Sequence, residues 1–315
     1  MRLNRELTTP PPGHSFRFLR WRGRVSDATL VLDSGETRKI EGEGDRWHFH
    51  SAMELTFFSQ GRGTRFVGDH IGGFEAEDLV LLGAGLPHYW HARGASAGAS
   101  VQWDFPAGHA FWGFPELNAL RPLFERAAHG VQIVGRCAGE VGRALQNLDA
   151  HRGACRLGAV IQILGKLAEG ARISGELVDL SQNSFQMRDE GGHQRALGDA
   201  VRYLLANFRS EVLLADLLEI TCMSKSTFSR QFRRHSGKTF QQFLLNLRME
   251  AACRALSETV EPILEIAQRC GFTEVSFFNR IFRRAEGCTP SEYRRRKQHQ
   301  DASVARSKRA DLDDA

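Results

Sequence analysis

Thr227–Phe243 (TFSRQFRRHSGKTFQQF) is repeated along the chain as Phe277–Tyr293 (FFNRIFRRAEGCTPSEY), and this repeat decides the fold of the C-terminal part. Seven of the seventeen aligned positions are identical, and a second apolar segment precedes each copy, so the pattern predicts helix, short turn and helix twice. In the second copy Gly271 ends the first helix. The residues that the spacing buries in this copy are Ile263, Ile266 and Ala267 on the first helix, and Phe277, Phe278, Ile281 and Phe282 on the second.

Burial of that apolar face leaves a polar, positively charged stripe on the outside of the second helix in each copy. The stripe residues recur at i, i+3, i+4 and i+7, the spacing of one helix face. An arginine can bridge O6 and N7 of guanine and an asparagine can bridge N6 and N7 of adenine, so such a helix suits the major groove of DNA. A helical hairpin with solvated arginines is the alternative, but it does not require the stripe to be duplicated in register. The stripe residues are Ser226, Ser229, Arg230 and Arg233 in the first copy, and Ser276, Asn279, Arg280 and Arg283 in the second.

The charge distribution also favours a nucleic-acid partner for the C-terminal part. Residues 193–297 hold 18 lysines and arginines against 11 aspartates and glutamates, whereas the net charge of the whole chain is only +5. Between the two copies, residues 240–256 are expected to form one helix of about 25 Å. That length would hold two recognition helices about one turn of DNA apart.

Segment 195–297 resembles the DNA-binding domain of the AraC/XylS family of bacterial transcription regulators. The resemblance implies two helix-turn-helix motifs on double-stranded DNA, with base contacts from the first three stripe residues of each copy and from Val275. The first copy departs from the family pattern at Leu218 and Cys222, where small residues are usual, and Cys222 lacks the ease with which glycine adopts a positive φ. The matching residues are Ser224, Phe228–Phe232, Gly237, Arg248, Ala251 and Ala252, then Ile266, Ala267, Gly271, Phe272, Phe278–Phe282 and Gly287–Arg294.

Residues 16–105 consist of short apolar runs separated by glycine-rich turns, which predicts strands. LTFF (55–58) and LVLL (79–82) are two such runs, typical of a β-sandwich or barrel. After Pro115 the apolar spacing becomes that of a helix face, so we expect a helical segment over 115–178. The AraC/XylS resemblance implies that this segment pairs two subunits, so we expect it to be a dimerisation segment. Packing of this face against the strands is the alternative to a homodimer interface. The face consists of Leu157, Val160, Ile161, Leu164 and Leu167.

A second resemblance lies within the predicted strands. Two segments are similar to the first and second cupin motifs, although Glu77 replaces the usual leading glycine of the second motif and Gly83 its proline. The resemblance implies a small double-stranded β-barrel, in which three histidines and one glutamate bind a divalent metal. The residues that carry it are Gly42, His48, His50, Glu54 and Gly61 in the first motif, and Gly83–His88 in the second.

The polar residues of these motifs can share one pocket. Residues two apart on a strand point to the same side, so His48 and His50 can face the same lumen. If His88 also enters the lumen, Trp90 shares its face and offers an aromatic platform for an apolar ring or the face of a sugar. Three uses of the set stay open: hydrogen bonds from His48, His50, Glu54 and His88 to an organic effector, a divalent metal bound by the same four residues, or a structural network.

The composition favours a cytoplasmic protein without a membrane partner. No run of about 18 apolar residues exists, and the polar N-terminus lacks the apolar region of a signal peptide. Six cysteines are scattered without CxxC spacing, which suits free thiols.

The sequence therefore predicts a multidomain α+β chain that regulates transcription. The expected parts are a cupin-like sensing and dimerisation domain over 1–178, a linker over 179–192, the DNA-binding domain over 193–297 and a disordered tail over 298–315. The expected function is that of an activator that contacts RNA polymerase and responds to a small molecule, for example a sugar. The alternative is a metal-dependent cupin enzyme with a DNA-tethering module, but fusion to a DNA-binding domain favours sensing, and no catalytic residue is assigned.

Overall fold

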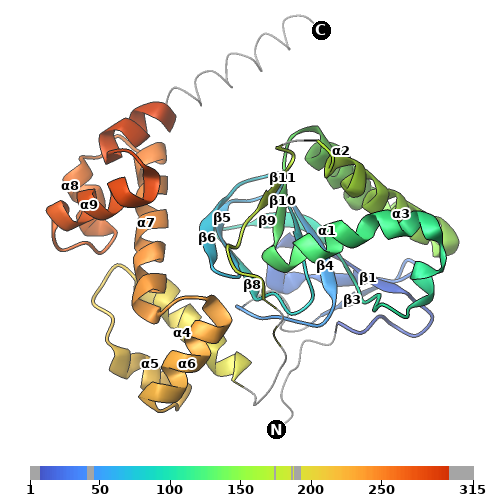
Figure 1. Ribbon diagram of the computed structural model, residues 1–315, viewed down its shortest axis with the longest axis horizontal. Helices are drawn as coiled ribbons and strands as arrows, with labels where there is room; N and C mark the ends of the chain where they lie inside the picture. The colour runs from blue at the N-terminus through green and yellow to red at the C-terminus, as the bar shows by residue number, and fades with distance from the viewer. Residues whose placement is uncertain (1–7, 41–45, 174, 186, 188–192, 298–315) are drawn as a thin grey trace, which may run out of the picture. The chain divides into compact units, whose positions relative to one another are not determined.

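The computed structural model describes residues 8–40, 46–173, 175–185, 187 and 193–297 (Figure 1). The predicted tail 298–315, Gly42 of the first motif, and residues 186 and 188–192 of the predicted linker lie outside this range. The chain divides into two compact units, each described by itself below. They are Met1–Arg202 with Ile220–Thr239, and Tyr203–Glu219 with Phe240–Ala315.

The predicted strands form two antiparallel sheets, so the α+β class is confirmed. The larger sheet has the strand order β11-β10-β7-β4-β9-β1-β2-β3, and the smaller has the order β6-β5-β8. The strand bounds are β1 Phe16–Gly23, β2 Thr29–Val31, β3 Thr37–Lys39, β4 Met53–Gln60, β5 Gly63–Val67, β6 His70–Phe74, β7 Asp78–Leu82, β8 His88–Ala92, β9 Ser96–Trp103, β10 Val131–Ile133 and β11 Leu177–Asp179.

Side chains on the central strands alternate between two buried environments. On β4, Leu55 and Phe57 join a core that the larger sheet forms with the helices, whereas Phe58 joins a second core with residues of the smaller sheet. Because neighbouring residues on a strand point to opposite faces, a strand buried on both sides is apolar throughout. This explains the uninterrupted apolar runs in the sequence.

Three helices pack against the outer face of the larger sheet. Figure 1 shows α2 and α3 side by side next to the strands. Strand β10 lies inside the segment 115–178 that was expected to be helical, and β11 begins at its end; both strands extend the larger sheet at one edge. The helix bounds are α1 Arg121–Arg126, α2 Gly135–Gln146 and α3 Gly153–Gly170.

Three residues of the apolar face of α3 belong to the core of their own chain. Val160, Leu164 and Leu167 are at most 2% exposed and share one cluster with Leu55 and Phe57. These three residues follow the alternative prediction of packing against the strands, whereas Leu157 and Ile161 of the same face are half-buried, and the subunit interface stays a prediction.

The segment 195–297 is helical, as predicted. The helices α6 and α9 each contain twelve residues and end at equivalent glycines, Gly237 and Gly287, whose φ angles are 69° and 68°. The sequence repeat is thus also a structural repeat. No helix in the described part of the chain is long and apolar enough to cross a membrane. The bounds are α4 Gln194–Asn207, α5 Leu214–Thr221, α6 Lys225–Ser236, α7 Phe240–Glu258, α8 Ile263–Arg269 and α9 Val275–Glu286.

Two residues that replace motif glycines keep the backbone conformation of glycine. Among the described residues, Glu77 and Cys222 are the non-glycine positions with positive φ, at 67° and 52°. Gly271, which aligns with Cys222 in the second copy of the repeat, has a φ of 89°. A side chain at positive φ is strained, so each replacement costs about 1–2 kcal/mol relative to an unstrained site.

Glu77→Gly should therefore stabilise the protein by about 1 kcal/mol, since relief of strain exceeds the extra entropy of the unfolded chain. Glu77 is exposed, so little side-chain packing is lost. Denaturant unfolding of the full chain measures the change. Glu77→Ala is the matched control, because it removes the same carboxylate but keeps the strain. Equal effects of the two variants would contradict the strain argument.

Leu164→Glu should destabilise the chain by at least about 3 kcal/mol, because it places an unpaired charge in the core. Gln162→Glu, on the exposed side of the same helix, should change stability by less than about 0.5 kcal/mol. Denaturant unfolding with size-exclusion chromatography checks both variants. A well-folded Leu164→Glu monomer would support the interface hypothesis.

Candidate functional sites

The stripe predicted for the second copy lies exposed along α9. Ser276, Asn279, Arg280 and Arg283 are all exposed, and Val275, at the start of the helix, is half-buried. The structure therefore brings the five predicted residues onto one accessible side of a single helix.

The opposite side of α9 fixes which residues face outward. Phe278 and Phe282 are fully buried. The ring of Phe278 lies 4.9 Å from that of Phe272, and the ring of Phe282 lies 5.4 Å from that of Tyr293, measured between centroids. Two phenylalanines four residues apart thus anchor one helix face.

Burial of Phe277 was predicted and is wrong. Its side chain is 38% exposed, because position 277 lies between the anchored face and the stripe. The guanidinium carbon of Arg280 lies 5.5 Å from the centroid of the Phe277 ring. This cation–π contact supports the arginine on the exposed surface.

The first copy presents the same arrangement on α6. Phe228 and Phe232 are fully buried, and Ser224 caps the helix, with its hydroxyl accepting a hydrogen bond from the Thr227 amide. The stripe residues of this helix are all exposed: Ser226, Ser229, Arg230 and Arg233.

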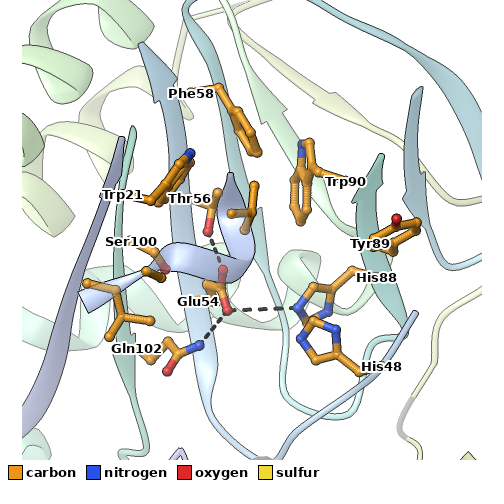
Figure 2. Close-up of a pocket in the computed structure, with 13 residues that line it drawn as sticks. Trp21, His48, Glu54, Thr56, Phe58, His88, Tyr89, Trp90, Ser100 and Gln102 are labelled. Carbon is orange, nitrogen blue, oxygen red and sulfur yellow. Dashed lines mark hydrogen bonds and ion pairs between the residues drawn. The ribbon is translucent and has the colours of Figure 1, made fainter. Parts of the chain in front are cut away.

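A buried cavity lies between the larger and the smaller sheet (Figure 2). His48 pairs with His88 through two backbone hydrogen bonds of 3.1 and 2.8 Å, which holds the segment before β4 against β8. Glu54 enters from β4. Figure 2 shows Glu54 between Gln102, Thr56 and His88. The predicted set of His48, His50, Glu54 and His88 is thereby brought together, with His50 directly beside Glu54.

All three histidines are oriented in the same way. Nδ1 of His48 donates to the Arg46 carbonyl, Nδ1 of His50 to that of Ala52, and Nδ1 of His88 to that of Leu86, at 2.8, 2.9 and 2.8 Å. These bonds turn Nε2 of His88 toward the cavity, whereas Nε2 of His50 lies 3.0 Å from Oε2 of Glu54 and His50 itself does not line the cavity. One ring nitrogen from each histidine lies within 4.8 Å of the others. A backbone carbonyl on one imidazole nitrogen is the usual support for a metal-binding histidine.

The charges of the site suit a cation. Burial lowers the pKa of His88 to about 3, so this imidazole is neutral and its lone pair is available. Burial by itself raises the pKa of Glu54, but the hydrogen bond from His50, the charge interactions with His88 and His50, and the hydrogen bond from Thr56 together outweigh it and hold that pKa well below 4.5. Gln102 also donates to the Glu54 carboxylate, at 2.8 Å. The cavity therefore combines the neutral imidazole of His88 with one carboxylate anion.

The donor set fits a divalent metal ion. Ligand atoms held tetrahedrally at about 2.1 Å from an ion lie about 3.4 Å apart. Oε2 of Glu54 lies 3.0 Å from Nε2 of His50 and 3.8 Å from Nε2 of His88. Among the described side chains, Nε2 of His88 is buried without a hydrogen-bond partner, which a metal ion would supply.

Trp90 lies where the sequence placed it, and the structure adds cavity residues that the motifs did not show. Trp90 and His88 face the same side, with ring centroids 5.9 Å apart. The alternation of polar and apolar residues on β9 could have indicated Ser100 and Gln102. The added residues are Leu19, Trp21, Val25, Ala28, Thr56, Phe58, Tyr89, Ser100 and Gln102.

Comparison with known proteins gives matches to the C-terminal part of the chain. A family model described as a helix-turn-helix domain matches residues 217–296, which include both stripes. Among solved structures, a transcriptional regulator with an AraC-type DNA-binding domain from Chromobacterium violaceum is 27% identical. It covers 34% of this chain and 96% of its own, with a TM-score of 0.32.

Two curated relatives match most of the chain. The HTH-type transcriptional activator RhaS of Pectobacterium atrosepticum is 24% identical over 247 residues, which cover 78% of this chain and 86% of that protein. The uncharacterized HTH-type transcriptional regulator YisR of Bacillus subtilis is 25% identical over 278 residues, covering 84% and 93%. RhaS of Escherichia fergusonii is 33% identical, but over 128 residues that cover 41% of this chain and 45% of that protein.

Proposed function

We infer that this chain, which belongs to the AraC/XylS family of transcription regulators, activates transcription in response to a small molecule bound in the cavity of its β region. The observation that carries the DNA-binding half of this proposal is the duplicated stripe, exposed on α6 and again on α9. The remaining partners that we propose are RNA polymerase and a second copy of the chain.

The stripe residues divide by their chemistry into two groups. Arg280 and Asn279 carry the donor and acceptor groups that recognise guanine and adenine edges, and we assign them to base contacts. Arg283 and Arg233, one turn further along their helices, are assigned to phosphates. We assign Ser226, Ser229, Arg230, Val275 and Ser276 to base contacts as well.

The cavity is proposed to hold a divalent ion on His48, His50, His88 and Glu54. When bound, the ion supplies a Lewis-acidic centre that an oxygen atom of the effector can bind. The chain's own residues orient the three imidazoles through backbone carbonyls and keep Glu54 ionised. We propose cupin-like sensing in place of turnover, because the family to which the chain belongs consists of regulators.

Arg280→Ala should weaken binding to a DNA site selected from random duplexes by about 1–3 kcal/mol and relax the preference at one base pair. Arg269→Ala is the control, since Arg269 is also an exposed arginine but lies on α8, outside the stripe. Equilibrium binding to the selected site and its single-base variants measures both. Unchanged affinity and base preference in Arg280→Ala would refute the assignment of α9.

Arg233→Ala should weaken binding to all these duplexes alike and reduce the salt dependence of binding, as loss of one phosphate contact requires. The same titrations, repeated over a range of salt concentrations, provide this comparison.

Metal-stripped protein should bind close to one Zn²⁺ per chain, and a hundredfold excess of free Zn²⁺ over Kd should raise the free energy of unfolding by about 2.7 kcal/mol. His88→Gln should weaken Zn²⁺ binding at least about 100-fold. His151→Gln, which changes an exposed histidine far from the donor set in sequence, should bind as the parent does. Metal analysis, calorimetry and thermal unfolding give the readouts; equal binding by the two variants would eliminate the ion site.

A further inference from the structure

The cavity has two ends of different chemistry (Figure 2). At one end the rings of Trp21, Phe58 and Trp90 form a continuous wall, with centroids 4.9 Å apart for Trp21 and Phe58 and 5.7 Å apart for Phe58 and Trp90. At the other end lie the Glu54 carboxylate and the histidines. A ligand that fills the cavity therefore meets an apolar wall on one side and the proposed ion on the other.

The aromatic end directs its polar groups away from the cavity. Nε1 of Trp21 donates to Oγ of Ser96, and Nε1 of Trp90 donates to the Asp78 carboxylate, each at 3.2 Å. Neither Ser96 nor Asp78 lines the cavity. A hydroxyl group placed against this wall would give up its hydrogen bonds to water without gaining a partner from the two indoles.

The polar end retains unused hydrogen-bonding capacity. Thr56 and Gln102 already donate to Glu54. In the described structure, the Ser100 hydroxyl has no hydrogen-bond partner, although Ser100 is only 3% exposed and lines the cavity. Buried hydroxyls normally have a partner, so an unpartnered one that lines a cavity indicates a missing ligand atom.

We propose that the effector is a monocarboxylate with an apolar ring, and this inference rests on the ion site proposed above. The carboxylate binds the ion and accepts a hydrogen bond from Ser100, while the ring packs against Trp21, Phe58 and Trp90. A divalent ion beside the single negative charge of Glu54 leaves the polar end positive, which selects an anionic head. The segregation of polar and apolar groups selects against a body that carries several hydroxyls, as in a sugar.

A matched pair of ring acids tests the proposal. Cyclohexanecarboxylate and galacturonate each have a six-membered ring and one carboxylate, but only galacturonate carries ring hydroxyls. Calorimetric titration of the full-length, Zn²⁺-loaded chain should show at least tenfold tighter binding of cyclohexanecarboxylate. The Zn²⁺-free chain should bind this acid more weakly, because Glu54 then repels the carboxylate.

Ser100→Ala should weaken binding of cyclohexanecarboxylate about fivefold, as loss of one hydrogen bond requires, and leave Zn²⁺ binding unchanged. Ser59→Ala is the matched control on β4, since Ser59 does not line this cavity. Thermal unfolding verifies that both variants are folded. A Ser100→Ala chain that binds the acid as tightly as Ser59→Ala does would overturn the assignment of the head group.

The outcomes separate the two proposals. Zn²⁺ binding together with galacturonate binding as tight as that of cyclohexanecarboxylate, or with no binding of either acid, overturns the ligand class and leaves the ion site standing. Failure to bind Zn²⁺ overturns the ion site and the ligand class together.

Discussion

The buried carboxylate of Glu54 imposes the strictest constraint on the β region. A carboxylate that is 7% exposed is tolerated only with hydrogen-bond donors around it. One of these, Gln102, comes from the opposite position on the neighbouring strand, because β4 and β9 pair Glu54 with Gln102. A slip of one residue would turn Leu55 into the cavity and leave the carboxylate without this partner. The register that buries the apolar residues of β4 is therefore also the register that gives Glu54 its hydrogen-bond partner in the pocket.

The sequence predicted the local part of this site and missed the part that depends on strand order. His48, His50 and Glu54 lie within seven residues, so their spacing alone placed them together. Gln102 is 48 residues from Glu54 and meets it only because β9 lies between β4 and β1. Spacing along a chain does not specify which strands become neighbours, so cross-strand partners could not be deduced. His88 is also distant from Glu54 in the sequence, and it was predicted because it belongs to the segment that resembles the second cupin motif.

Periodicity identified apolar faces correctly but not always what covers them. The spacing of Val160, Leu164 and Leu167 predicted one helix face, and these three residues pack in one cluster with residues of the larger sheet. A hydrophobic stripe satisfies its requirement for burial equally well with a sheet or with a second subunit. Phe277 was also predicted to be buried, but Phe278 and Phe282 anchor α9 and Phe277 stays exposed. At two positions the chain has another residue where the motif has glycine, and the turn keeps its conformation: Glu77 and Cys222 both have positive φ.

The two copies of the repeat separate the residues that fix the helix from the residues proposed to contact DNA. The buried phenylalanines and the final glycine are identical in both, and these residues set the length and orientation of α6 and α9. Arg230 and Arg280 are equivalent, so both helices offer the same guanidinium donor. The neighbouring stripe position differs, with Ser229 in one copy and Asn279 in the other. The asparagine amide offers a donor and an acceptor on two separate atoms, which can bridge N6 and N7 of adenine, whereas serine offers a single hydroxyl. One scaffold can therefore carry two different sets of proposed base contacts, since exposed positions change without cost to the packing beneath them.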